Sequence, residues 1–468
     1  MTQIPMAETL TSNVSVVSPE ITYFFLTILA IMIVALALEE KIHAKKSLIV
    51  GILAMVCLIL GDYFQLIPLG NIILPGGHSI EMPVYIPAVD WGVIAIILGS
   101  SLFVDVTSRS GLFTWIAIKL TKASGGDPLK LLWYYSSMTV LFSAVLNNVT
   151  AMIIVGSLTV VSLTKLERQN LLLGFLLTEG LLTNVGGLLT LISSVPNIIV
   201  GNAAGISFMT FFIKASPYVL IATVATVLVS AKYFSIKKLV NAEEQQKAAY
   251  LVSSFDENDG IESAGFFWFA SIALMLFILV IASASVLPIA KDLGMGFIAM
   301  SFAAIMLLRY KSEVDRFYKT IDWDLLGFFM ALFVVINVME HAHVLALIGE
   351  GIALLVGESK NLFGTGALLV ASAAASSVTD NIPLAAMLAK ILATNATPGD
   401  SPLWWSVVFG ANLGGNITPI GSASTLVAVT IMHKHKLGLS FGGFVAKASL
   451  FAIMQLVLAA VYVLLILY

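Results

Sequence analysis

Two runs of 34 residues without any charged side chain, Leu131–Thr164 and Gly180–Ile213, constrain the fold more than any other feature of this sequence. One straight helix of that length would measure about 51 Å at about 1.5 Å per residue. The hydrocarbon core of a bilayer is only about 30 Å thick. Each run is therefore predicted to turn back or to unwind inside a membrane.

Composition places the chain among the polytopic α-helical membrane proteins. Only 11% of its 468 residues are charged, less than half of the share of about 25% in soluble proteins, and the mean hydropathy is +0.99. Such an apolar composition excludes a soluble enzyme. Cys57 is the single cysteine, which excludes a disulfide scaffold. The net charge of −3 predicts no nucleic-acid partner. Simple spans are predicted at Ile21–Leu38, Ser47–Gly61, Trp91–Val104, Ala215–Ala231, Ser263–Ala290, Met295–Leu308, Leu325–Met339 and Ala448–Tyr468.

The first long run is predicted to be a re-entrant hairpin. Its midpoint is the polar cluster Leu146-Asn147-Asn148-Val149-Thr150, and its flanks are basic, with Lys130 before it and Lys165 after it. Basic flanks favour the cytoplasmic side of the membrane. The segment is therefore expected to enter and leave the membrane from the cytoplasm.

The second long run is predicted to be a broken helix. It contains Thr183-Asn184-Val185-Gly186-Gly187 and then Ser193-Ser194-Val195-Pro196-Asn197. Glycine, serine and proline at membrane depth indicate unwound backbone, which is tolerated only where it is buried in protein or lines a cavity.

Both patterns recur in the second half of the chain. Asn361–Ala389 contains one charge, Asp380, beside Asn381, and Ser401–Met432 contains the Gly- and Asn-rich stretch from Gly410 to Ser424. Three motifs align in the same order: Asp90-Trp91 with Asp322-Trp323 at an offset of 232, Ser143…Asn147-Asn148 with Ser376…Asp380-Asn381 at 233, and Asn184-Val185-Gly186-Gly187 with Asn412-Leu413-Gly414-Gly415 at 228. The last offset also places Thr190 on Thr418.

Loop charges predict the orientation of the two halves. Lys41, Lys45 and Lys46 place the first connection inside, whereas the loop Asp62–Asp90 has no Lys or Arg and is expected outside. The chain is thus predicted to be two inverted repeats, residues 1–240 and 263–468, joined by a cytoplasmic linker at 241–262. Each repeat would hold about five spans, one re-entrant hairpin and one broken helix, which is typical of alternating-access transporters.

These motifs resemble those of the ion transporter superfamily, in particular its arsenite-permease, P-protein and citrate-transporter-like branch. Sodium–dicarboxylate symporters and NhaD-type Na⁺/H⁺ antiporters are relatives within it. The resemblance extends from about residue 85 to the C-terminus. It implies a homodimer in the plasma (inner) membrane, with a scaffold part and a moving transport part in each protomer.

Two positions depart from the pattern of that branch. Asn147 stands where the branch usually has an aspartate, and Ser194 stands in Ser193-Ser194-Val195-Pro196-Asn197 where the branch usually has Gly-Asp-Pro-Pro-Asn. Asp380, the equivalent of Asn147 in the second half, is retained. The two losses count against a mechanism that needs paired carboxylates in the first half.

The hairpin tips and broken helices are expected to converge on one site at half depth. Helix N-termini there suit anions, while carbonyl oxygens suit Na⁺. Asn and Thr side chains in such places either line a site or only cap the broken helices, and for the set we favour lining. The predicted solute- and ion-binding residues are Asn147, Asn148, Thr150, Asn184, Gly186, Gly187, Thr190, Ser193, Ser194, Asn197, Asp380, Asn381, Asn412, Gly414, Gly415, Asn416, Thr418, Ser422 and Ser424.

Charged residues at membrane depth suggest how transport is coupled. Asp380 is a candidate cation ligand or proton carrier, because an unpaired carboxylate at bilayer depth is costly. Glu179 is either a second proton carrier or a buried hydrogen-bond partner. Na⁺ is predicted to bind near Asn147, Asn148, Asp380 and Asn381. Asp105 is expected at the membrane interface.

The sequence predicts a transporter and no enzyme. The leading hypothesis is an ion-coupled secondary transporter (permease) of a small anion or oxyanion-like solute that works by alternating access. No nucleotide-binding loop is present and no cofactor is expected, so coupling would come from Na⁺ or H⁺. A Na⁺/H⁺ antiporter is the alternative, and Asp380 keeps it open.

Overall fold

The computed structural model describes residues 17–67, 71–73, 79–83, 85–356, 362–379 and 381–467. It is built almost entirely of helices, with a two-stranded antiparallel ribbon in which β1 (Asn71–Ile73) pairs with β2 (Ser79–Glu81). Within these residues, nine helices are long and apolar enough to cross a membrane. They are α1 (Pro19–Ala37), α3 (Lys46–Tyr63), α5 (Trp91–Ser108), α8 (Asn148–Lys165), α11 (Phe208–Tyr233), α13 (Ala264–Ala282), α14 (Pro288–Leu307), α16 (Trp323–His341) and α22 (Phe441–Tyr462).

The other α-helices are shorter or more polar, and several of them form the centre of the molecule. They are α2 (Glu39–Ile42), α4 (Tyr85–Ala88), α6 (Leu112–Ser124), α7 (Pro128–Val145), α9 (Leu172–Gly186), α10 (Val195–Ala204), α12 (Ala242–Ser253), α15 (Val314–Tyr318), α17 (Val344–Val356), α18 (Leu362–Val378), α19 (Asn381–Thr394), α20 (Pro402–Gly414) and α21 (Ala423–Lys434).

The first 34-residue run reverses direction at its polar midpoint. Helix α7 ends at Val145 and α8 begins at Asn148. The two arms lie side by side along their length, because Ser143 Oγ donates to Asn148 Oδ1 at 2.7 Å near the tip and the Tyr135 and Ser162 hydroxyls meet at 2.6 Å near the base. In the second half, α18 ends at Val378 and α19 begins at Asn381.

The second run is a broken helix, and so is its counterpart. Helix α9 ends at Gly186 and α10 begins at Val195, with turns and bends between them. Helices α20 and α21 are likewise interrupted between Gly414 and Ala423. Proline at the first or second position starts α10, because its fixed φ suits the first turn of a helix.

The structure corrects the predicted span Ser263–Ala290. Helix α13 ends at Ala282, and Pro288 starts α14, which bends at Gly294 with a φ of 76°. The ribbon β1–β2 and the helices α6, α12 and α17 were not predicted either. An uncharged run reports depth in the membrane, and it does not report where a helix ends inside that run.

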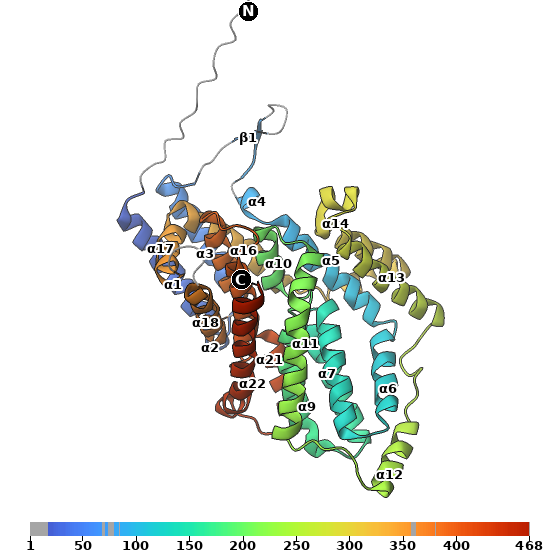
Figure 1. The fold of residues 1–468 in the computed structure, drawn as a ribbon. Helices are drawn as coiled ribbons and strands as arrows, with labels where there is room; N and C mark the ends of the chain where they lie inside the picture. Colours follow the sequence, from blue (N-terminus) through green and yellow to red (C-terminus); the bar gives the residue numbers. More distant parts are fainter. Residues whose placement is uncertain are drawn as a thin grey trace, which may run out of the picture.

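Long helices of the first half of the chain pack against long helices of the second half. Helix α5 packs against α14, and α3 packs against α16. Small residues allow the first contact: a Cβ on Gly99 would lie 2.5 Å from the backbone of Ala299, and one on Gly296 would lie 2.8 Å from Ala95 Cβ. A second group gathers around the hairpins, with α7, α8 and α21 on α9, α18 on α20, and α10 on α19. Helices α11 and α22 lie side by side in front of this group (Figure 1).

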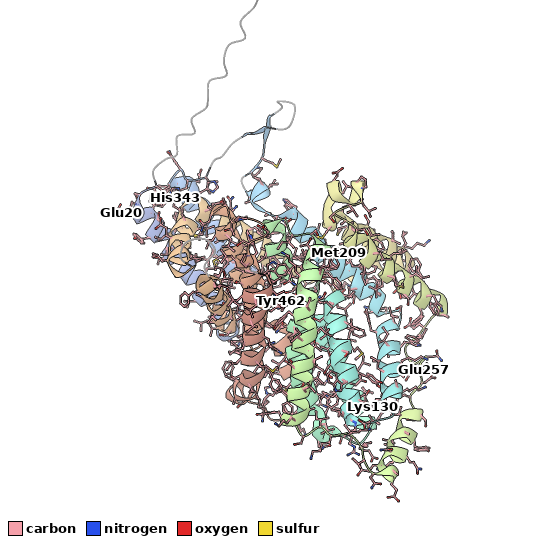
Figure 2. The ribbon with its side chains drawn as sticks, in the orientation of Figure 1. Glu20, Lys130, Met209, Glu257, His343 and Tyr462 are labelled. Carbon is pink, nitrogen blue, oxygen red and sulfur yellow. The ribbon has the colours of Figure 1, made fainter. Side chains whose placement is uncertain are left out.

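Polar and charged side chains mark both ends of the bundle (Figure 2). Helix α12 lies at one end, and the ribbon strand β1 lies at the other (Figure 1). Lys130 and Glu257 are at the α12 end, and Glu20 and His343 are at the opposite end (Figure 2). Glu257 accepts hydrogen bonds from Lys119 and, at 3.2 Å, from Lys122, and these two ammonium groups hold the pKa of its carboxyl below the usual range.

Candidate functional site

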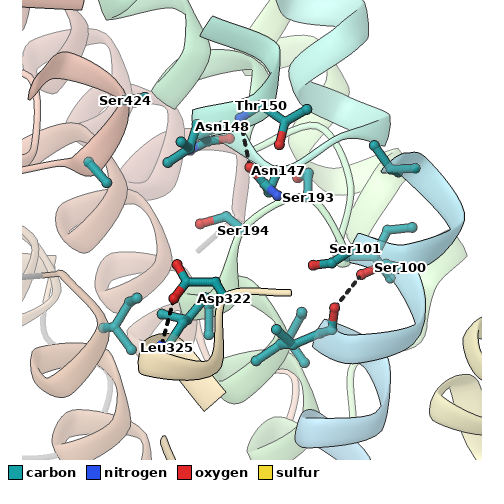
Figure 3. A pocket seen from close by; sticks show the side chains of 18 of the residues that line it. Ser100, Ser101, Asn147, Asn148, Thr150, Ser193, Ser194, Asp322, Leu325 and Ser424 are labelled. Atoms are coloured by element: carbon teal, nitrogen blue, oxygen red, sulfur yellow. Dashed lines mark hydrogen bonds between the residues drawn. The ribbon is translucent and has the colours of Figure 1, made fainter. Parts of the chain in front are cut away.

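A cavity of about 440 Å³ lies where the hairpin tips and the broken helices meet (Figure 3). Eight polar residues predicted from the sequence line it: Asn147, Asn148, Thr150, Ser193, Ser194, Asn381, Ser422 and Ser424. The four helices α8, α10, α19 and α21 all begin at residues of this lining. Their N-termini bring main-chain N–H groups and positive dipole ends to one place.

Asn147 both caps a helix and lines the cavity. Its Oδ1 accepts a hydrogen bond from Thr150 N at 2.8 Å, which is the bond of a helix N-cap. The side chain lies at the cavity wall opposite Ser194 and Asp322 (Figure 3). Capping and lining, the two roles open from the sequence, are therefore combined in one residue.

The first broken helix satisfies its free carbonyl groups with its own side chains. Ser193 Oγ donates to Gly187 O at 2.6 Å. Asn197 Nδ2 donates to Gly187 O at 2.7 Å and to Thr190 O at 3.0 Å. Buried backbone polar groups need such partners. Thr190 and Asn197 are thus structural residues behind the cavity wall, since neither lines the cavity.

The two halves use equivalent hydrogen bonds to join hairpin and broken helix. In each bond a side-chain hydroxyl donates to a main-chain carbonyl, and the offsets of 233 and 228 found in the sequence relate the partners. The matched bonds are Ser143 to Thr183 O and Ser376 to Ala411 O, both at 2.6 Å, and Thr190 to Ala144 O and Thr418 to Ser377 O, both at 2.5 Å.

A buried chain of amides connects the two broken helices. Asn148 Nδ2 donates to Asn184 Oδ1 at 3.2 Å, and Asn184 Nδ2 donates to Asn416 Oδ1 at 2.8 Å. Asn416 continues to Gln455 Oε1 at 2.7 Å, and Gln455 Nε2 donates to Thr226 Oγ1 at 3.0 Å. Gln455 was not predicted, because a single amide within an apolar helix carries no motif.

A second amide contact crosses between the halves. Asn412 Nδ2 donates to Asn197 Oδ1 at 2.9 Å, and Ser194 Oγ donates to Asn412 Oδ1 at 2.7 Å. Ser194 also lines the cavity. These bonds fix the relative position of the two unwound segments, which is the requirement for a preorganised site.

The four predicted site glycines are needed for close packing. An added Cβ would lie 2.7 Å from the Val140 backbone at Gly186 and 2.3 Å from the Ala373 carbonyl oxygen at Gly414. An added Cβ would lie 2.6 Å from Asn148 Oδ1 at Gly187 and 2.9 Å from the Gly421 carbonyl oxygen at Gly415. Gly186, Gly187, Gly414 and Gly415 do not line the cavity, so they support the site through close approach of the helices.

Acidic residues outside the predicted set also line the cavity. Asp105, Asp322 and Asp324 face it together with Lys46, the one basic residue of the lining among those that the structure describes. Asp324 Oδ1 accepts from Ser47 N at 3.2 Å and Ser47 Oγ at 2.5 Å. Asp105, expected at the membrane interface, is part of the cavity wall. Asp322 entered the sequence argument only as an alignment marker, because a helix cap and a site residue give the same signal.

Glu179 lies away from the cavity. It is fully buried in the packing of α8, α9 and α21. Its Oε1 accepts from Thr159 Oγ1 at 2.6 Å, and its Oε2 has no hydrogen-bond partner among the described residues. This arrangement fits the alternative of a buried hydrogen-bond partner, and the role of proton carrier stays a prediction.

The predicted coupling-ion residues are placed only in part. Asp380 lies outside the described residues, whereas its neighbour Asn381 lines the cavity. Asn147 and Asn148 lie at the same wall. No group of three or more His, Cys, Asp or Glu side chains suited to a metal ion occurs within the described ranges.

The fold matches two solved membrane transporters. The YdaH transporter of Alcanivorax borkumensis superimposes with a TM-score of 0.54 at 12% identity, covering 95% of this chain and 98% of YdaH. MtrF of Neisseria gonorrhoeae gives a TM-score of 0.57 at 12% identity, covering 90% of this chain and 95% of MtrF.

Sequence relatives point the same way. An uncharacterized transporter of Mycobacterium tuberculosis H37Rv is 28% identical over 380 residues, covering 80% of this chain and 86% of the relative. The human P protein is 25% identical over 495 residues, covering 88% of this chain and 56% of the P protein.

Fold, cavity and relatives together define a multi-pass integral membrane protein of the secondary transporter class. Its bacterial relatives indicate the plasma membrane. The chain belongs to the citrate transporter family (CitMHS), whose sequence profile matches residues 28–410. The resemblance to the citrate-transporter-like branch inferred from the motifs is thereby confirmed.

Proposed function

We propose that this protein moves a small carboxylate-bearing anion, of which citrate is the model, across the membrane together with Na⁺ or H⁺. The observation that carries the proposal is the convergence of four helix N-termini on one cavity lined by neutral amides and hydroxyls. Each N-terminus carries roughly half a positive charge and free N–H groups, which favour an anionic ligand. The description of the family supplies citrate as the first candidate.

The charges of the cavity wall favour ion coupling. Among described residues the wall holds three carboxylates and one lysine. A multivalent anion in such a cavity lacks enough basic side chains to neutralise it. A cation or proton that binds with the anion would remove the repulsion, so the favourable binding of each ligand depends on the other.

We further propose that the chain works by alternating access as two inverted repeats, 1–240 and 263–468, with the linker 241–262 in the cytoplasm. The matched hydrogen bonds of the two halves support the repeat. The position of α12 opposite β1 agrees with the orientation expected from loop charges. The homodimer stays a proposal that rests on the family resemblance.

The antiporter alternative is disfavoured by the residues of the first hairpin tip. Exchange of Na⁺ for protons needs a carboxylate at the site, and this tip presents Asn147 and Asn148. Glu179 is separated from the cavity. The carboxylates that remain for such an exchange are Asp380 of the second hairpin and Asp105, Asp322 and Asp324 of the cavity wall.

The decisive experiment uses purified protein in liposomes. Uptake of radiolabelled citrate, a dicarboxylate and an inorganic oxyanion is measured with an imposed Na⁺ gradient, pH gradient or neither. We expect gradient-driven uptake of at least one carboxylate, and loss of the gradient dependence in Asp380→Asn. Na⁺-driven proton movement without any anion would favour the antiporter instead.

The topology is tested separately with Lys130→Cys and Lys165→Cys in a Cys57→Ser background. An impermeant thiol reagent should label both positions from the cytoplasmic side. Labelling from opposite sides would exclude a re-entrant hairpin.

A further inference from the structure

The caps of α5 and α16 form equivalent structures with one difference. Asp90 Oδ1 accepts from Val93 N at 3.1 Å, and Asp322 Oδ1 accepts from Leu325 N at 2.9 Å. The tryptophan after each aspartate donates its indole N–H to a carbonyl five residues earlier, at 3.0 Å in both halves. The second carboxylate oxygens differ in what they contact.

Asp90, the N-cap of α5, joins α5 to α10, which belongs to the broken helix of the first half. Its Oδ2 accepts a hydrogen bond from Asn202 Nδ2 of α10 at 2.7 Å. Asp322 Oδ2 has no such partner in the described part of the chain, and Figure 3 shows this oxygen turned into the cavity on the side of Ser194. Two equivalent carboxylates are therefore in two different states.

The residue equivalent to Asn202 is Thr430. Helices α10 and α21 start after equivalent serines, Ser194 and Ser422, at the offset of 228, and this offset places Asn202 on Thr430. Thr430 is exposed, and its hydroxyl donates to Leu426 O at 2.9 Å within its own helix, with no other acceptor among the residues that the structure describes. Rotation of this hydroxyl away from the helix would redirect its one proton to an acceptor on another helix.

The faces of α10 and α21 show the same asymmetry. Ile198 of α10 is 2% exposed, and α10 packs against α5. Its equivalent on α21, Leu426, is 41% exposed. A hollow of about 490 Å³ beside Trp91 and Asn202 is lined by none of the hairpin-tip residues. Helix α10 is therefore seated against α5 at Asp90, whereas the equivalent face of α21 is exposed and Asp322 faces the cavity.

We propose that Asp322 and Thr430 form the hydrogen bond that closes the inner mouth when the protein faces outward, in exchange for the Asp90–Asn202 bond that closes the outer mouth here. This inference rests on the proposed function, which supplies the orientation in the membrane (inner and outer) and the alternating-access mechanism. Asp90 and Asp322 are thus positioning residues, which set the balance between two conformations without binding the solute.

The first test compares Asp90→Asn with Asp322→Asn, each with Leu426→Cys and Cys57→Ser. Asparagine keeps either helix cap and removes the carboxylate that accepts the gating bond. A bond to a charged group is strong enough to change a two-state equilibrium roughly tenfold. Asp90→Asn should lower the rate of cytoplasmic labelling at position 426 about tenfold, and Asp322→Asn should leave it equal or raise it. Shifts of the same sign in both variants would overturn the proposal, because a merely structural role predicts no opposition.

The second test uses two double-cysteine proteins and a short bifunctional thiol reagent. The pair Asp90→Cys and Asn202→Cys should cross-link without solute, and the pair Asp322→Cys and Thr430→Cys should cross-link only as the protein turns over in a gradient. Failure of the second pair while the first reacts and uptake continues would also overturn the proposal. If both pairs cross-link as proposed in a gradient, but the protein takes up none of the tested anions, the gating proposal stands. Only the assignment of the solute is then refuted.

Discussion

Asn184 is the centre of the buried network, and its replacement by alanine should destabilise the protein measurably. Its Oδ1 accepts from Asn148 Nδ2 at 3.2 Å, Ser422 Oγ at 3.0 Å and Ser424 Oγ at 3.2 Å, and its Nδ2 donates to Asn416 Oδ1 at 2.8 Å. Asn184→Ala removes all four bonds at a site that is fully buried.

The size of the effect follows from how these partners are left. At about 0.5–1.5 kcal/mol net for each hydrogen bond, four bonds amount to roughly 2–6 kcal/mol. Ser422 and Ser424 remain bonded to each other at 2.9 Å, whereas Asn416 Oδ1 loses the partner recorded for it. We therefore expect a loss of roughly 2–4 kcal/mol in the free energy of unfolding.

The assay is thermal unfolding of purified protein in detergent, followed by tryptophan fluorescence. For a chain of this size the entropy of unfolding is about 1 kcal/mol/K, so we expect the unfolding midpoint to fall by roughly 2–4 °C. Asn170→Ala is the matched control, because Asn170 is an exposed amide for which no side-chain hydrogen bond occurs among the described residues. A midpoint within error of the control would show that the amide chain does not stabilise the contact between the halves.

Three further predictions follow from single contacts. Asn147→Asp keeps the helix cap but adds a negative charge to the cavity, so anion uptake should fall roughly tenfold or more, whereas Asn147→Ser should retain it. Gly414→Ala places a methyl group 2.3 Å from a carbonyl oxygen of α18. We expect the free energy of unfolding to fall by about 1–3 kcal/mol or more, as measured by thermal unfolding. Gly442→Ala is the control, because an added Cβ there has no neighbour within 4 Å. Glu257 has a pKa below its usual range in the folded protein because Lys119 and Lys122 donate to it; its contribution to linker docking is present above the unfolded pKa and is lost as pH falls through the folded pKa. Protection from hydrogen exchange at 254–258, taken relative to the intrinsic exchange rate at each pH, should therefore fall on acidification, and Glu257→Gln should abolish that pH dependence.

Each of these outcomes has a clear opposite. Unchanged uptake in Asn147→Asp would mean that the first hairpin tip does not contact the anion. Equal midpoints for Gly414→Ala and Gly442→Ala would mean that α18 and α20 can separate freely. An acid-induced loss of protection that persists in Glu257→Gln would assign the effect to another group.

The sequence by itself determined the membrane class, the two hairpins and the two broken helices. Uncharged runs of 34 residues cannot cross a bilayer straight, and Asn, Gly, Ser and Pro inside them mark the places where the chain turns or unwinds. The lining residues Asn147, Asn148 and Asn381 followed from these marks because polar groups at that depth need a cavity or a partner.

Only the tertiary structure decided which polar residues face the cavity and which satisfy the backbone behind it. Thr190 and Asn197 bond freed carbonyls, and Gly186 and Gly414 permit close packing, yet all four carry the same signal in the sequence as residues of the wall. The position of Asp322 was equally hidden. A side chain's partner depends on helices that meet from distant parts of the chain, and hydropathy along one helix holds no information about them.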